Sequence, residues 1–139
     1  MVAYEEVTAE ADITINHEGN VLKKGSLLVA MVNASEFNKL LATTEPPADR
    51  QEQLHKITVD LADFMAAIDG SGLFDYFEPD EWLANKNYGR AMIAAHWLKI
   101  HPDAVSPAVR DNLKTILHDG GAAFQEEFIS VYPEAQQFV

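Results

Sequence analysis

The sequence predicts a mainly α fold, a compact bundle of about five helices with a short β-hairpin or extended arm at its N-terminus. Apolar residues recur every three or four positions through most of the chain after residue 25, and proline or glycine pairs separate these stretches. The 139 residues are 47% hydrophobic and 23% charged, enough for one core without covalent staples. We therefore expect a single helical domain over 1–139, with 1–25 as the hairpin or arm.

The N-terminal part contains the weakest helix signals. Ile13-Thr14-Ile15 and Val21-Leu22 flank a segment, 16–20, that holds glycine and asparagine. Both residue types tolerate the positive φ angles of tight turns. The pattern predicts a short β-hairpin that packs on the helices.

The next segment has two interpretations. The apolar spacing from Leu27 to Ala42 predicts a helix. Leu27 to Val32 alone has no clear period and could instead form a buried strand, followed by a shorter helix capped by Ser35. This second interpretation would make the fold α+β.

A second helix is expected from Asp49 to Ile68, after the Pro46-Pro47 stop. Asp49 and Glu52 have the spacing of a capping pair. The apolar stripe expected to face the core consists of Leu54, Ile57, Leu61, Phe64, Met65 and Ile68. Gly70 and Gly72 are expected to end the helix.

The second half of the chain predicts three more helices. The first spans Asp80 to Ile100, with Pro79 before it and an interruption at 85–87, and its apolar stretch 91–98 is typical of a central helix. Ser106-Pro107 is a strong helix start, and Gly120-Gly121 is the matching stop. The last helix carries residues 124–132 and stops at Pro133, and the tail 134–139 is expected to fray.

The charge is strongly negative and unevenly distributed. From Glu45 to Glu81 ten acids face only Arg50 and Lys56, which gives −8 of the total −12. Such a field repels nucleic acid and acidic membranes and attracts basic partners. There is no cysteine and no apolar run of membrane-spanning length. We expect no direct nucleic-acid binding, no membrane association and a cytoplasmic location, in a bacterium or a virus-infected host cell.

The segment from Gly72 to Leu83 interleaves aromatic and acidic residues. We interpret it as a partner-binding site in which rings act as anchors and carboxylates steer approach. The candidate residues are Asp75, Tyr76, Phe77, Glu78, Asp80, Glu81 and Trp82. The alternative is a connector whose rings point into the core.

No specific metal or cofactor motif is present. Glu52-x-x-His55 has a spacing used in di-iron bundles but lacks a second copy, and we interpret it as a solvated helix face. His96 lies in an apolar stretch and is expected to be a hydrogen-bonded core residue. Asp60 and Asp63, three apart on one helix, could hold a divalent cation only with further ligands.

The function that fits best is a non-enzymatic interaction protein that binds a basic surface of another protein, as an inhibitor or nucleic-acid mimic of the viral anti-defence type. One alternative is a homodimer or larger assembly protein. Another is a small metal-dependent hydrolase that uses Asp60 and Asp63 with His96 or Glu126.

Overall fold

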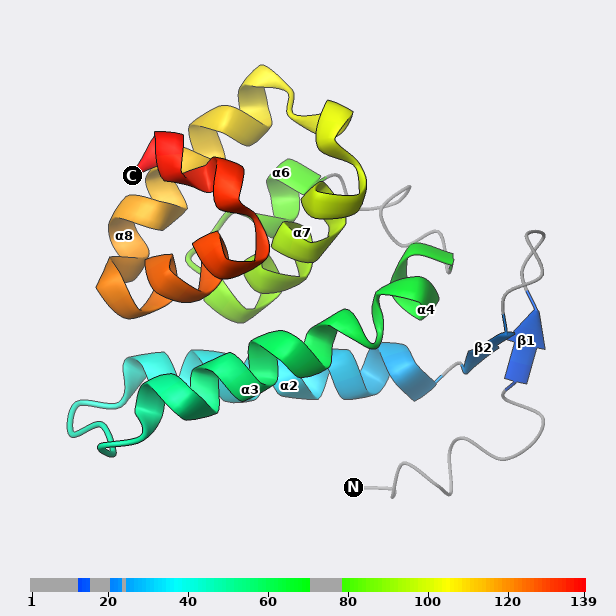
Figure 1. Ribbon diagram of the computed structural model, residues 1–139, viewed down its shortest axis with the longest axis horizontal. Helices are drawn as coiled ribbons and strands as arrows, with labels where there is room; N and C mark the ends of the chain where they lie inside the picture. The colour runs from blue at the N-terminus through cyan, green and yellow to red at the C-terminus, as the bar shows by residue number, and fades with distance from the viewer. Residues whose placement is uncertain (1–12, 16–20, 24, 71–78) are drawn as a thin grey trace.

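The structure is a computed structural model that describes residues 13–15, 21–23, 25–70 and 79–139. It is mainly α, as the sequence predicts (Figure 1). The elements are, in order, β1 (Ile13–Ile15), β2 (Val21–Lys23), α2 (Gly25–Ala42), α3 (Arg50–Ala62), α4 (Met65–Gly70), α6 (Pro79–Trp82), α7 (Tyr88–Ile100), the 3₁₀ helix η2 (Pro102–Ala104), α8 (Pro107–Val131) and the 3₁₀ helix η3 (Pro133–Phe138). None of these helices is long and apolar enough to cross a membrane.

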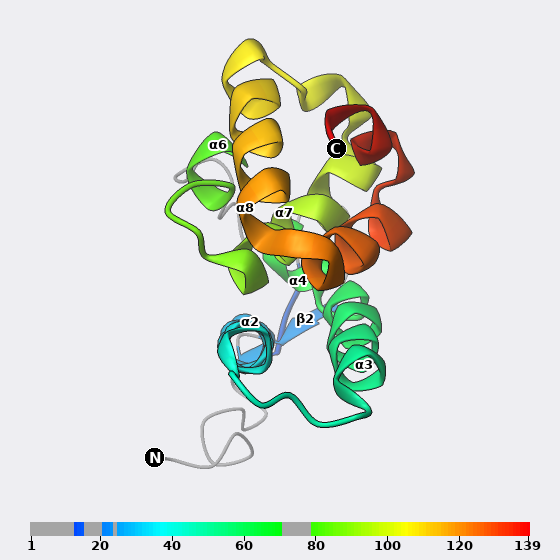
Figure 2. The same cartoon turned by 90° about the vertical axis from the view of Figure 1, so that its left-hand side faces the viewer.

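The helices form two groups around α7. The antiparallel helices α2 and α3 lie side by side on one side of α7, and α6, α8 and η3 lie on the other (Figures 1 and 2). Each residue from Ala91 to His96 is buried. The expectation that 91–98 forms the central helix is therefore confirmed, except that Trp97 is only partly buried.

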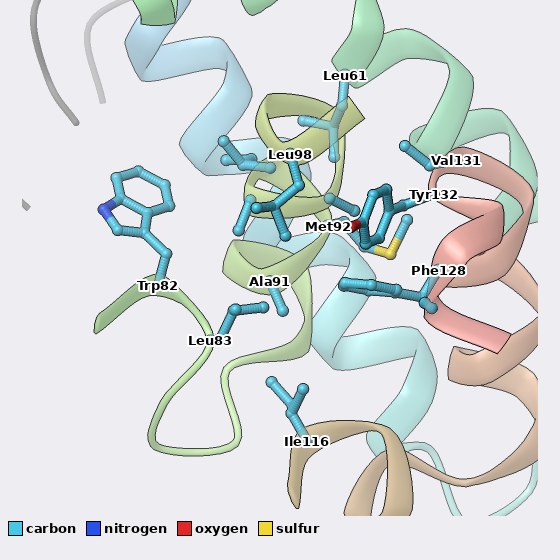
Figure 3. Close-up of a cluster of buried hydrophobic side chains, with 14 of the residues drawn as sticks. Leu61, Trp82, Leu83, Ala91, Met92, Leu98, Ile116, Phe128, Val131 and Tyr132 are labelled. Atoms are coloured by element: carbon cyan, nitrogen blue, oxygen red, sulfur yellow. The ribbon is translucent and has the colours of Figure 1, made fainter. Parts of the chain in front are cut away.

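The core forms around α7, where α2 and α8 pack against it. Figure 3 shows Met92 of α7 beside Phe128 of α8, and Leu98 of α7 near Leu61 of α3. Phe124 joins this cluster, with its ring centroid 5.5 Å from that of Phe128 and 6.4 Å from that of Phe37 in α2. These rings tie α2, α7 and α8 into one apolar core.

The helical interpretation of residues 27–42 is confirmed, and the strand alternative is wrong. Ala30, Ala34 and Phe37 recur at helical spacing and are buried against α7. The two backbones approach closely, because a Cβ at Gly89 would overlap with the carbonyl group of Ala34. β1 and β2 pair antiparallel with Thr14 opposite Leu22, and β2 lies near α4 (Figure 1).

The helix predicted from Asp49 to Ile68 is two helices. At Asp63 and Phe64 the amides bond to carbonyls three residues back, at 3.1 Å each, which tightens the chain between α3 and α4. The proposed cap is also wrong. Asp49 Oδ1 accepts a 2.8 Å hydrogen bond from the Gln53 side chain and caps no backbone amide.

The remaining helix boundaries follow the sequence signals. Ser106 Oγ accepts from the Val109 amide at the start of α8, and Gly121 kinks that helix with φ 77°. The predicted interruption before α7 is present, with α6 ending at Trp82. The tail does not fray as expected, since η3 packs on α8 and buries Ala135 completely.

Candidate protein-binding face

The predicted partner-binding segment is only partly described by the structure. Asp75, Tyr76, Phe77 and Glu78 lie outside the described residues, so their role stays a prediction. Of the other three predicted residues, Asp80 is half-buried and Glu81 is exposed. Trp82 is only 2% exposed, which corrects the expectation of an exposed anchor at this position.

Trp82 is buried at the end of α6. Its ring has the Arg90 guanidinium 4.6 Å from its centroid, a cation–π arrangement. The Asp80 carbonyl accepts a 2.8 Å hydrogen bond from the Asn112 amide, which fixes α6 on α8. Trp82 therefore packs α6 against the rest of the fold.

The acidic stretch from Glu45 to Glu81 does not form one face. Its carboxylates on α3 are Glu52 and Asp60, whereas Asp80 and Glu81 belong to α6. Both views show α7 between α3 and α6 (Figures 1 and 2). Carboxylates that are close in sequence therefore lie on separate parts of the described surface, and the α3 carboxylates must be considered separately.

The α3 carboxylates belong to a surface that we call the outer α2–α3 face. It consists of exposed or half-exposed residues on the sides of α2 and α3 opposite their buried residues. The members are Leu28, Val32, Glu36 and Lys39 of α2, Glu52, Lys56, Val59 and Asp60 of α3, and Asp63 directly after α3.

A groove of about 390 Å³ runs between the two helices of this face. Leu40 and Ile57, both partly buried, supply its apolar lining. Its polar lining consists of Asn33, Glu36, Gln53, Lys56 and Asp60. The groove therefore combines an apolar surface with carboxylates from both helices.

The outer α2–α3 face also exposes aliphatic side chains. Leu28 is 48% exposed, Val32 is 41% exposed and Val59 is 51% exposed. They are three of the five exposed large hydrophobic residues in the described part of the chain. Exposed apolar area concentrated on one layer is typical of a docking surface.

The charges on this face are mostly free to interact with a partner. Glu36 and Lys39 form a solvent-exposed ion pair of 3.2 Å, which contributes little stability. Glu52, Asp60 and Asp63 have no ion pair within 4 Å among the described residues. The face as a whole carries four carboxylates and two ammonium groups.

In the described part of the chain, the structure brings no further metal ligands to Asp60 and Asp63. Asp63 is exposed, whereas His96 is buried and its Nε2 lies 2.8 Å from the Thr58 carbonyl oxygen. Burial lowers the pKa of His96, and the hydrogen bond to Thr58 has the smaller, opposite effect of raising it. Across the described residues, no three or more histidine and acidic side chains are grouped to hold a metal ion. His96 is the hydrogen-bonded core residue that the sequence predicts.

A buried carboxylate that contacts an exposed histidine was missed by the sequence reasoning. Glu127 is 2% exposed, and its Oε1 lies 2.8 Å from Nδ1 of His55, which was expected to be fully solvated. Burial raises the pKa of Glu127, and the hydrogen bond and charge of His55 act in the opposite direction. The signal was present, because Glu127 lies on the apolar stripe of Phe124, Phe128 and Val131.

A second cluster joins α4 to α7. Asp69 accepts a 3.3 Å hydrogen bond from the Trp97 indole, and its two oxygens lie 3.3 Å from His101 Nε2. The rings of Trp97 and His101 have centroids 4.5 Å apart. Asp69 thus connects α4 to the end of α7 and does not belong to the outer α2–α3 face.

Comparison of the chain with protein-family models, with curated proteins and with solved structures finds no match.

Proposed function

We propose that this protein is a non-enzymatic interaction protein that binds a basic surface of another protein through the outer α2–α3 face. The observation that carries the proposal is the coincidence, on that one face, of exposed aliphatic side chains, a groove, and carboxylates of α3 that form no ion pair with any described residue. Aliphatic side chains supply apolar contact area, and carboxylates around them select a positively charged partner.

The groove defines how such a partner would dock. An apolar side chain of the partner would enter between Leu40 and Ile57. Lysine or arginine residues beside it would reach Glu36 on one helix and Asp60 on the other. Both carboxylates lie on regular helices, so the backbone that carries them needs no further ordering on binding.

The charge of the face favours a different protein over a second copy of this chain. In a symmetric dimer the same patch meets itself, so four carboxylates and two ammonium groups would face a second patch with the same excess of negative charge. Like charges in contact are destabilising, and the total charge of −12 adds repulsion at longer range. A basic partner removes both penalties.

The finer part of the proposal concerns inhibition. If the basic surface of the partner normally binds nucleic acid, this protein competes for it, because carboxylates on the face would occupy the positions of phosphates. Glu81 and the acidic residues of the segment 75–78 would extend the contact only if the partner also reaches α6.

The experiment that tests the proposal is affinity capture from a host lysate with two variants of equal charge. The face variant carries Glu36→Gln, Glu52→Gln, Asp60→Asn and Asp63→Asn. The matched control removes the same four charges from exposed positions elsewhere, with Asp103→Asn, Asp111→Asn, Glu126→Gln and Glu134→Gln. A partner retained by wild type and by the control is then purified, and its affinity is measured by calorimetry at two salt concentrations.

The proposal expects the face variant to lose the partner and the control to keep it. Loss of about tenfold or more in affinity corresponds to one or two charged contacts. Equal loss in both variants would mean that total charge, and not this face, attracts the partner. Equal retention would refute the assignment of the outer α2–α3 face and turn attention to α6.

A further inference from the structure

A hollow of about 520 Å³ opens where three elements meet, namely α2, the turn between α6 and α7, and α8 just before its kink. A second hollow of about 220 Å³ lies beside it. Lys86 and Asp119 line both hollows, so the two spaces adjoin at these residues. The site is distinct from the outer α2–α3 face and does not depend on the function proposed above.

One wall of the larger hollow is a locked pair of amides. Asn38 Nδ2 donates a 2.7 Å hydrogen bond to Asn87 Oδ1. Asn38 Oδ1 accepts from the Gly89 amide at 2.8 Å, and Asn87 Oδ1 also accepts from the Arg90 amide at 3.1 Å. Because both amide oxygens are occupied, the orientation of each side chain is fixed, and Asn87 Nδ2 remains as a donor without a partner among the described residues.

The other walls supply an acceptor and a hydroxyl group. The Asp119 carboxylate is bonded only by its exposed neighbour His118, at 3.2 Å, within the described part of the chain. The Tyr88 ring packs on Phe124 with a centroid distance of 4.9 Å, which fixes its position. Burial, and then the Asp119 carboxylate, raise the pKa of the Tyr88 phenol, so its hydroxyl group stays protonated at neutral pH.

The turn that carries Lys86 is strained. Asn85 and Lys86 have φ angles of 61° and 56°, in the left-handed region. This conformation costs a lysine about 1 kcal/mol or more, and glycine would avoid the cost. Lys86 has no ion pair within 4 Å among the described residues, so no such pair offsets the strain. Strained residues of this kind cluster at ligand-binding positions.

The lining determines the class of ligand. It holds one ammonium and one carboxylate group, so it selects neither an anion nor a cation, and the charge of −12 on the chain disfavours anions further. Amide, ammonium, phenol and carboxylate groups together both donate and accept, as hydroxyl groups do. We propose that the hollow binds an uncharged polyhydroxylated ligand of the saccharide class, held by Lys86, Asn87, Tyr88 and Asp119.

The test is saturation-transfer NMR on the full chain, with glucose, galactose, N-acetylglucosamine and maltose as probes. Two variants, Lys86→Gly and Asp119→Ala, are compared with the control Asp103→Ala, which lies on η2 outside the hollow. Lys86→Gly retains the left-handed backbone while removing the ammonium group. Thermal melting of each variant establishes that it is folded. If Lys86→Gly is not folded, Asp119→Ala alone tests the location of the site.

We expect wild type and the control to transfer saturation to at least one sugar. Affinity should fall about tenfold or more in each site variant, as is typical when a charged hydrogen-bond partner is removed. Absence of transfer from wild type to every probe would overturn the proposal. Unchanged transfer in both variants would overturn the location, and displacement of the sugar by glycine or inorganic phosphate would overturn the ligand class.

Discussion

Replacement of Gly89 by alanine tests the close approach of the α7 backbone to α2. Alanine improves helix propensity by about 1 kcal/mol inside a helix. Against this gain, its Cβ overlaps with the carbonyl group of Ala34, and forcing packed helices apart costs about 1–3 kcal/mol. Separation also breaks the 2.8 Å hydrogen bond from the Gly89 amide to Asn38, worth about 1 kcal/mol. The net expectation is a destabilisation of about 2 kcal/mol.

The assay for Gly89→Ala is urea unfolding followed by circular dichroism, with Ala34→Gly in the same background as the control. The overlap involves the backbone of Ala34 and not its methyl group, so Ala34→Gly should not restore stability. Rescue by Ala34→Gly would mean that side-chain crowding limits the approach. Unchanged or higher stability of Gly89→Ala would refute the inferred contact between α2 and α7.

Three further changes test other parts of the structure. Burial raises the pKa of Glu127, so the charged carboxylate is disfavoured in the folded state. As pH rises from the pKa of an unfolded glutamate through the higher folded value, wild type should therefore lose stability relative to Glu127→Gln. Parallel pH profiles in urea unfolding would contradict this. Trp82→Ala should destabilise the fold by about 3–5 kcal/mol because the ring is buried, whereas an unchanged melting temperature would restore it as an exposed anchor. Asn87→Ala should lower the stability of the fold by about 1–2 kcal/mol, because Asn87 caps α7 and also accepts a hydrogen bond from Asn38. This loss should exceed that of Ser106→Ala. Equal losses in thermal melting would show that the amide pair adds no stability.

The helices could be predicted where local chemistry determines them. Ser106 begins α8 because a hydroxyl cap and the following proline act within one turn, and Gly121 kinks it because glycine adopts positive φ at little cost. The break at Asp63 and Phe64 has no such local signal. The apolar stripe continues through the break, since Leu61 before it and Met65 and Ile68 after it are all buried. Packing of α4 against α7 is a tertiary effect that periodicity does not report.

The candidate sites were harder to predict because they depend on which helices become neighbours. Glu127 could have been noticed as a carboxylate on an apolar stripe, but its partner His55 lies 72 positions away. The Asn38–Asn87 pair likewise joins residues 49 positions apart and leaves no pattern in the sequence. Trp82 was misassigned because alternating aromatic and acidic residues look the same whether the rings point into the core or toward a partner.

The distribution of charge along a helical chain is a poor guide to the distribution of charge on its surface. Carboxylates that are close in sequence between Glu45 and Glu81 are separated in space, because α3 and α6 pack on opposite sides of α7 (Figure 2). Asp69 is withdrawn further by its contacts with Trp97 and His101. What remains on α3 is a smaller set of carboxylates beside exposed aliphatic side chains. A partner would therefore be selected by the combination of apolar contact and charge, so its affinity should retain a salt-independent part that a purely electrostatic complex would lack.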